Sequence, residues 1–346
     1  MNIKNFLQEI RYYIKLEGVK RPFLKFLWYQ SIFSKLVNTP PYNKIYAKRI
    51  KKQAKRIKPG ILQIETTNAC NARCLMCPHR FMKRPVKTMS LNDFQKVLDN
   101  VMKNYPSIKR VTLSGFGEPL LDPGLFKKID YINKKYPKLK IDLFTNAGLL
   151  NKERADKLLQ KKLGRVTFSI NGAEKEDYEK IMGLDYNIVT KNVSYFLKQK
   201  KLLKKEFLVN ISMMVLKENE KKAQTFIEMW KPLTDSVRVY YPQDWVGELK
   251  ENLGEQKIPY ERKQWPCSAP WTHIVIHSNG EFLACCRDFN SQWAFGNLIK
   301  GDDIKKLREG KKFQEFLKQQ LKSDFSFPLC KNCDHAYDSS VEWWLW

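Results

Sequence analysis

The sequence of 346 residues lacks any apolar run that approaches the roughly 18 residues a membrane-spanning helix needs. The longest apolar stretch near the N-terminus, residues 22–37, is interrupted by two lysines. The first nine residues already include Lys4 and Glu9, and no small-residue cleavage site follows them. These absences predict a chain that neither crosses a membrane nor is exported, so we expect a cytoplasmic location.

Acidic residues are scarce, since 36 Asp and Glu stand against 63 Lys and Arg and leave a net charge of +27. Hydrophobic residues at 43% and aromatic residues at 13% nevertheless exclude a disordered chain. The deficit is largest over residues 1–60, which hold 15 Lys and Arg but only Glu9 and Glu17. Apolar residues recur there at helical spacing, which predicts a basic helical extension over residues 1–58. It suits a peripheral anionic membrane surface, an anionic substrate or nucleic acid, and a solvated helical face also explains it.

Cysteines are absent between Cys77 and Cys267, so the eight in the chain form two separate groups. Clustered cysteines in a chain without export features indicate metal or redox sites, not a disulfide framework. We therefore expect two sites on two domains. The first group is Cys70, Cys74 and Cys77, and the second is Cys267, Cys285, Cys286, Cys330 and Cys333.

Between these groups, short β-rich runs alternate with segments of helical periodicity. Strands are predicted over residues 61–67, 110–114, 140–145, 165–170, 207–215 and 236–241, and helices over 91–101, 125–133, 152–160, 188–197 and 220–230. Strands joined through helices pair in parallel with right-handed crossovers. The series over residues 59–255 thus predicts an α/β fold, a partial (β/α)6 barrel with ligands at the C-terminal ends of its strands.

The rest of the chain, residues 256–346, has a different texture. A turn at Ser278-Asn279-Gly280 separates two strand-like runs, and one amphipathic helix is predicted from Asp302 to Leu321. This segment predicts a small cysteine-bearing domain that depends on a metal centre, because it is too irregular to have much core of its own.

The first cysteine group follows directly on the first predicted strand, so its thiols project from one loop at the mouth of the barrel. Thiolates at this spacing suit a soft metal, and a 4Fe–4S cluster held by three of them keeps one iron open to a cofactor. A closed zinc site is the alternative, with His79 as the fourth ligand.

The spacing C-x3-C-x2-C after the first strand resembles that of the radical SAM superfamily. Ser114-Gly115-Phe116-Gly117-Glu118-Pro119, after the second strand, resembles its glycine-rich motif, whose backbone and carboxylate receive the amino group of S-adenosylmethionine. Residues 145–148 resemble its Thr-Asn-Gly turn with one residue inserted. Over about residues 60–245, the resemblance implies cofactor contacts from Met76, Gly115, Gly117, Glu118, Asn146, Ser169, Asn171 and Met214. Turn formation by Ser169 and Asn171, and core filling by Met214, are the alternatives.

The resemblance also implies the chemistry. Cys70, Cys74 and Cys77 would hold the catalytic 4Fe–4S cluster. A one-electron reductant such as flavodoxin or ferredoxin would supply the electron that reduces this cluster. Cleavage of S-adenosylmethionine would give a 5′-deoxyadenosyl radical that abstracts a hydrogen atom from the substrate.

The second cysteine group has the spacing C-x17-C-x44-C-x2-C, with Gly280 five residues before Cys285. It resembles the SPASM/twitch extension of radical SAM proteins, which implies one auxiliary 4Fe–4S cluster held by Cys267, Cys285, Cys330 and Cys333. Cys286 is left over as an alternative ligand, a hydrogen donor or a small buried residue. A zinc knuckle of Cys330, Cys333 and His335 is the alternative for this end, and His273 and His277 are expected as core or surface residues.

Together these features predict a radical SAM oxidoreductase that oxidises a sugar, an aminocyclitol or a similar anionic or lipid-linked substrate by two electrons. Peptide epimerisation or crosslinking is the alternative reaction. A zinc protein that binds nucleic acid is the alternative of another class, although nucleic acid is not the expected partner. The residues expected to contact substrate at the barrel mouth are His79, Arg80, Arg238, Tyr240, Gln243, Asp244 and Trp245.

Overall fold

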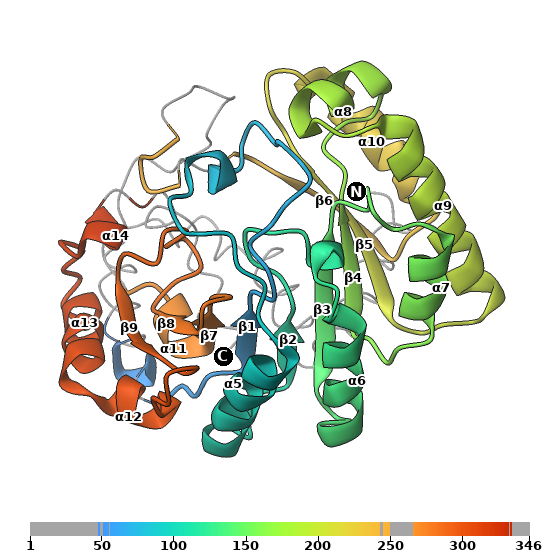
Figure 1. Cartoon of the computed structure of the whole chain (residues 1–346). Helices are drawn as coiled ribbons and strands as arrows, with labels where there is room; N and C mark the ends of the chain where they lie inside the picture. Colours follow the sequence, from blue (N-terminus) through green and yellow to red (C-terminus); the bar gives the residue numbers. More distant parts are fainter. Residues whose placement is uncertain are drawn as a thin grey trace.

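The computed structural model describes Lys48 and residues 51–54, 56–242, 245–249, 266–331 and 333. Within these residues, nine strands form one sheet in the order β6-β5-β4-β3-β2-β1-β7-β8-β9 (Figure 1). The first six strands are parallel and adjacent in chain order: β1 (Ile61–Ile64), β2 (Arg110–Thr112), β3 (Lys140–Thr145), β4 (Arg165–Ser169), β5 (Leu208–Met214) and β6 (Ser236–Tyr240). This confirms the predicted α/β fold with six parallel strands.

Helices connect the parallel strands and cover one face of the sheet (Figure 1). Their bounds are α5 (Leu91–Asn104), α6 (Leu125–Lys135), α7 (Lys152–Leu159), α8 (Lys175–Met182), α9 (Tyr186–Leu202) and α10 (Ala223–Trp230), with short 3-10 turns η1 (Pro78–Phe81), η2 (Pro119–Leu121) and η3 (Glu220–Lys222). Helix α5 begins after Ser90, whose side chain accepts a hydrogen bond from Asp93 N at 3.0 Å. Helix α8 was not predicted, and the capping box of Glu174 and Asp177 explains where it begins.

Side chains alternate along the strands between the helices and the inside of the barrel. Val111, Ile141 and Val166 are fully buried on the helix side. The other face carries polar side chains such as Asp142, Thr167 and Asn210. The inside of the barrel is therefore polar, as expected where ligands bind.

The C-terminal segment extends the same sheet instead of forming a separate one. Strand β7 (His273–Ile276) pairs in parallel with β1, from Ile61↔His273 to Ile64↔Ile276, and β8 (Glu281–Leu283) and β9 (Ala294–Asn297) follow in antiparallel. The division of the chain into domains stays a prediction, and its boundary at 255/256 lies outside the described residues. The C-terminal segment also contains four helices: α11 (Ala269–Thr272), α12 (Ile304–Glu309), α13 (Lys311–Leu321) and α14 (Pro328–Lys331).

Two further predictions concern the helix over residues 302–321 and the basic extension over residues 1–58. The single helix expected from Asp302 to Leu321 is two helices, because Gly310 adopts an extended conformation (φ −67°, ψ 152°) between α12 and α13. Most of the predicted basic extension lies outside the described residues, so its contact with an anionic membrane surface stays a prediction. No helix of the described residues is long and apolar enough to cross a membrane.

Candidate functional site

The first cysteine group lies in the loop that leaves β1 at the C-terminal edge of the sheet. This loop pairs with the end of α8, because Arg73 N donates to Met182 O at 2.9 Å and Leu75 N donates to Ile181 O at 3.0 Å. Gly183 ends α8 with φ +65°, a left-handed conformation that favours glycine. The unpredicted helix therefore positions the cysteine loop.

The thiols of Cys70, Cys74 and Cys77 are half-buried on this loop. Burial raises the pKa of all three, to about 11 for Cys77, and the Cys74 thiolate is further disfavoured by repulsion from Cys77 and Cys70. A cationic iron centre removes both penalties, so the three residues fit the metal that the sequence predicts. Among the described residues, no three Cys, His, Asp or Glu side chains are grouped closely enough to hold a metal ion.

His79 follows the third cysteine in η1, and its Nε2 atom lies 2.8 Å from the carbonyl oxygen of Asn68. Donation of the Nε2–H to this carbonyl fixes the ring to the cysteine loop and leaves Nδ1 unprotonated, as in histidines that bind a metal through that atom. The zinc site with His79 as fourth ligand therefore stays the alternative. Arg80 is exposed and lies over the ring of Phe81, 4.7 Å from its centroid.

The glycine-rich motif after β2 packs tightly against the loop after β1. A Cβ atom on Gly117 would lie 2.3 Å from the carbonyl oxygen of Thr67, and one on Gly115 would lie 2.6 Å from the side chain of Glu65. These two positions need glycine for internal packing, a reason that the sequence alone did not give. Any contact of their backbone with S-adenosylmethionine stays a prediction.

Glu118 is buried at the end of this motif and joins it to β3. Its carboxylate accepts hydrogen bonds from Thr145 Oγ1 at 2.7 Å, from Asn146 N at 2.7 Å and from Leu120 N at 3.1 Å. Burial raises the pKa of Glu118, and these three donors oppose that effect. The predicted role as acceptor for the cofactor's ammonium group is untested, whereas the role in fixing the two loops is seen directly.

The other predicted cofactor contacts lie at the same edge of the sheet. Asn146 follows β3 and donates to Asn71 Oδ1 at 2.9 Å, next to the cysteine loop. Asn171 follows β4, and its Oδ1 atom accepts from Met214 N at 2.7 Å at the end of β5. Ser169 is the last residue of β4. Met76 is buried in the cysteine loop. The structure thus gathers all of these residues at the C-terminal edge, although each role stays a prediction.

Sequence analysis missed Glu65, which is fully buried directly after β1. Its carboxylate accepts two hydrogen bonds from Arg84 at 2.8 and 3.1 Å, and one from Phe116 N at 3.0 Å in the glycine-rich motif. It also accepts from Ser278 N and Oγ, at 3.2 and 2.9 Å, in the turn after β7. An acid that ends an apolar strand was the only signal available, because its partners are distant in the sequence.

The second cysteine group lies partly on the loop between β8 and β9. Cys285 is half-buried and Cys286 is exposed. Their thiols are hydrogen-bonded to each other, which raises the pKa of Cys285 and lowers that of Cys286. Cys267 lies close enough to disfavour the Cys286 thiolate, and Cys330 Sγ accepts a hydrogen bond from Gln320 Nε2 at 3.4 Å. The structure therefore places the thiols of Cys285 and Cys286 side by side.

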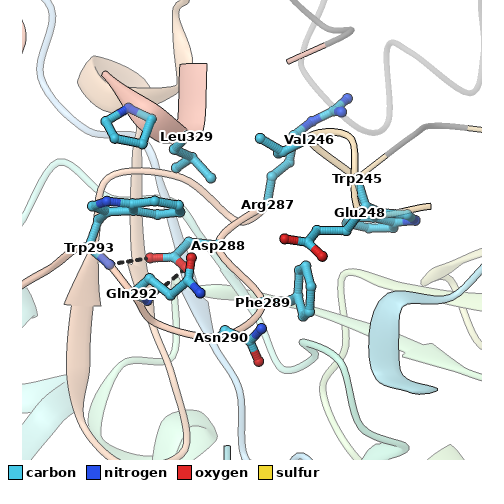
Figure 2. Close-up of a pocket in the computed structure, with 11 residues that line it drawn as sticks. Trp245, Val246, Glu248, Arg287, Asp288, Phe289, Asn290, Gln292, Trp293 and Leu329 are labelled. Carbon is cyan, nitrogen blue, oxygen red and sulfur yellow. Dashed lines mark hydrogen bonds between the residues drawn. The ribbon is translucent and has the colours of Figure 1, made fainter. Parts of the chain in front are cut away.

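A cavity of about 170 Å³ lies beside this loop (Figure 2). It is lined by Trp245, Val246, Glu248, Arg287, Asp288, Phe289, Asn290, Gln292, Trp293, Pro328 and Leu329. On one side, the ring of Phe116 lies 5.7 Å from Trp245 and 6.0 Å from Phe289, which links the cavity to the glycine-rich motif. On the other side, Arg287 and Leu329 are close in sequence to Cys285 and Cys330. The cavity therefore lies between the two predicted sites.

Of the predicted substrate contacts, only Trp245 lines this cavity. Its Nε1 atom donates to Met76 O at 2.8 Å, so the indole is fixed to the cysteine loop. Arg238 is half-buried and Tyr240 is exposed at the sheet edge, on β6. Gln243, Asp244 and His335 lie outside the described residues.

Comparison with known protein families agrees with this arrangement. A family model described as the radical SAM superfamily matches residues 64–229. A second model, described as an iron-sulfur cluster-binding domain and called SPASM, matches residues 267–334. These two segments contain the first and second cysteine groups, respectively.

Three curated proteins are similar in sequence. The FeMo cofactor biosynthesis protein NifB of Methanocaldococcus jannaschii is 30% identical over 286 residues, which are 79% of this chain and 90% of that protein. The antilisterial bacteriocin subtilosin biosynthesis protein AlbA of Bacillus subtilis is 25% identical over 68% of this chain, which spans only 56% of that protein. The S-adenosyl-L-methionine-dependent 2-deoxy-scyllo-inosamine dehydrogenase of Niallia circulans is 20% identical over 80% of this chain and 93% of that protein.

Solved structures share the fold. Streptococcus suis SuiB bound to precursor peptide SuiA has a TM-score of 0.64 at 15% identity, over 96% of this chain and 88% of that one. BtrN in complex with AdoMet and 2-DOIA has a TM-score of 0.53 at 19% identity, over 80% of this chain and 92% of that one. At these identities the likeness shows the fold alone.

Proposed function

The chain belongs to the radical SAM superfamily and carries a SPASM iron–sulfur domain, and on this premise we propose that it oxidises its substrate by two electrons. When bound, the two 4Fe–4S clusters supply the electron that cleaves S-adenosylmethionine to methionine and a 5′-deoxyadenosyl radical, and an acceptor for the second substrate electron. Cys70, Cys74 and Cys77 are the proposed ligands of the catalytic cluster. Cys267, Cys285, Cys330 and Cys333 are those of the auxiliary cluster.

The proposed reaction balances. The substrate would lose one hydrogen atom, which converts the 5′-deoxyadenosyl radical into 5′-deoxyadenosine, one proton to solvent and one electron to the auxiliary site. A one-electron donor such as a flavodoxin or ferredoxin supplies the electron that cleaves the cofactor. A secondary alcohol carbon would thereby become a carbonyl.

The observation that carries this proposal is the position of the cavity. It lies between the glycine-rich motif, through Phe116, and the loop of Cys285, so a bound substrate would lie between the two cysteine groups. The chain's own residues shape this space: Trp245 is held to Met76 O, and Phe289 O is held by Arg84 Nε at 2.6 Å. These two hydrogen bonds fix the indole of Trp245 and the backbone of Phe289 around the cavity.

The substrate class is proposed as a sugar, an aminocyclitol or the side chain of a peptide. The dehydrogenase of Niallia circulans supports the first two, since it aligns with 80% of this chain. The peptide alternative, epimerisation or crosslinking, is supported by the likeness to AlbA and by the fold shared with SuiB. The basic composition predicted an anionic substrate. The cavity lining does not support this prediction, because it carries two carboxylates and only one guanidinium.

The test is anaerobic purification, iron analysis, and reaction with dithionite and S-adenosylmethionine. We expect brown protein with about eight irons that forms 5′-deoxyadenosine. Colourless protein with zinc would overturn the proposal. With substrate, oxidation of an alcohol gives a product two mass units lower, and borohydride reduction restores the original mass. A crosslinked product is not reduced by borohydride. Epimerisation leaves the mass unchanged in normal water and incorporates one deuterium in deuterated water.

A further inference from the structure

The cavity of about 170 Å³ is smaller than the roughly 300 Å³ at which whole-ligand pockets begin, so it suits one end of a substrate. Three aromatic rings contribute to its walls, with Trp245 and Trp293 on opposite sides and Phe289 between them (Figure 2). Three charged side chains, Glu248, Arg287 and Asp288, also line it. What the cavity binds depends on which of these charges remains available.

Two of the three charges are already engaged. The Asp288 carboxylate accepts hydrogen bonds from Gln292 N and Trp293 N, both at 2.9 Å, and the residue is buried (Figure 2). The Arg287 guanidinium lies near the thiols of Cys285 and Cys286 and favours their ionised forms. In Figure 2 it points away from Asp288, toward Val246. Arg287 thus serves the auxiliary site, and Asp288 shapes its loop.

The carboxylate of Glu248 is different. Glu248 is an exposed residue of the lining, and Figure 2 shows its carboxylate turned toward Trp245 and Phe289. Among the described residues, no side chain or backbone N–H is seen to donate a hydrogen bond to it. It is therefore the one charge of this cavity lining without an evident protein partner in the part of the chain that the structure describes.

The backbone that presents Glu248 is strained. Trp245 and Val246 have φ values of 50° and 69°, in the left-handed region, where a β-branched residue is especially unfavourable. Such a conformation persists only where surrounding contacts hold it. Here the hydrogen bond from Trp245 Nε1 to Met76 O and the edge contact with Phe116 hold it. Backbone strain of this kind clusters at ligand-binding sites.

We propose that this cavity binds a protonated amine of the substrate, with Glu248 as its counter-ion and the indole rings of Trp245 and Trp293 as cation–π partners. The inference rests on the proposed function, because it treats the cavity as the substrate site. It narrows the substrate to a molecule with a primary ammonium group, such as an aminocyclitol or a lysine side chain, in a protein whose net charge of +27 otherwise disfavours cations.

The test is ligand-observed NMR on the full chain with its clusters, at pH 7. The probes are n-butylammonium chloride, n-butanol and sodium butanoate, which share length and differ in charge. We expect the methyl resonance of butylammonium to broaden at least threefold more than that of either other probe. Glu248→Gln should remove this excess, Glu248→Asp should keep part of it, and Trp293→Leu should reduce it.

The matched control is Glu315→Gln, which removes the same charge from an exposed position on α13 and should leave the broadening unchanged. Equal broadening by butanoate, or unchanged broadening in Glu248→Gln, would overturn the inference. Iron content and 5′-deoxyadenosine formation of the unmodified chain are measured on the same preparation. A preparation that cleaves the cofactor but ignores the amine defeats this inference alone, whereas one without iron or cleavage defeats the proposed function.

Discussion

Glu65 and Arg84 form a bidentate ion pair, with N–O distances of 2.8 and 3.1 Å, in which the side chains are 0% and 6% exposed. Arg84 also donates to Phe289 O on the loop that lines the cavity, while Glu65 accepts from Phe116 N and from Ser278. One buried pair thus ties together the end of β1, the glycine-rich motif, the turn after β7 and the loop of the second cysteine group.

Replacing the Glu65 carboxylate should lower the stability of the folded chain. Glu65→Gln leaves the Arg84 guanidinium buried without its counter-ion, so we expect a loss of about 3 to 5 kcal/mol in the free energy of unfolding. Thermal melting of the full chain measures it. Glu153→Gln, at an exposed ion pair with Lys157, should leave the melting temperature unchanged. Glu65→Gln combined with Arg84→Met should recover part of the loss, and a mild effect of Glu65→Gln alone would contradict the assigned role.

The neighbouring His277 should make stability depend on pH. Burial lowers its pKa from 6.5 to about 4, and its Nδ1 atom lies 2.7 Å from Ser291 Oγ. As the pH falls from 6.5 toward 4, the unfolded chain gains a proton that folded His277 does not, so stability falls with pH in that window. We expect His277→Asn to flatten the fall by up to about one proton per molecule, as measured by denaturant titrations at several pH values. An unchanged slope would show that His277 is already charged in the folded chain.

The first cysteine group should carry cofactor cleavage. Replacing Cys70, Cys74 and Cys77 together by Ala should abolish 5′-deoxyadenosine formation, because no thiolate remains to hold the catalytic cluster. About four irons should remain bound at the second group. Iron analysis and product quantification with dithionite as reductant check both points. Residual cleavage at the unmodified rate would mean that other residues hold the cluster.

The adjacent pair in the second group should be distinguishable by iron content. We expect Cys286→Ala to keep about eight irons and Cys285→Ala to lose about four, because Cys285 is the predicted ligand and its Sγ already accepts a hydrogen bond from Arg287 N at 3.4 Å. The two thiols are hydrogen-bonded to each other, so each variant is the matched control for the other. The reverse pattern would assign the auxiliary cluster to Cys286.

The sequence predicted those features that depend on residues close together in the chain. The period of apolar residues predicted all six parallel strands and the helix that begins at Leu91. The cysteine spacing and the Ser114–Pro119 motif predicted the family. What the sequence could not show depends on partners far apart in the chain. Glu65 has its partners 19 and about 210 residues away.

Three other features were missed, each for its own reason. The pairing of β7 with β1 has no sequence signature, since either strand would read the same in a separate sheet. Helix α8 is short, with eight residues, and its capping box begins at Glu174, which is a less common residue for that position. The cavity assembles from residues 245–248, 287–293 and 328–329, and only Trp245 among them was expected.

The pairing of β1 with β7 has a consequence for synthesis on the ribosome. Ile61 emerges about 210 residues before His273, so at roughly 5 to 20 residues per second one edge of β1 waits about 10 to 40 seconds for its partner. An unpaired strand edge invites wrong pairing with other chains. The nascent chain would therefore depend on chaperones until its last quarter is made, and shortened chains that end before His273 would aggregate instead of reporting what the barrel does alone.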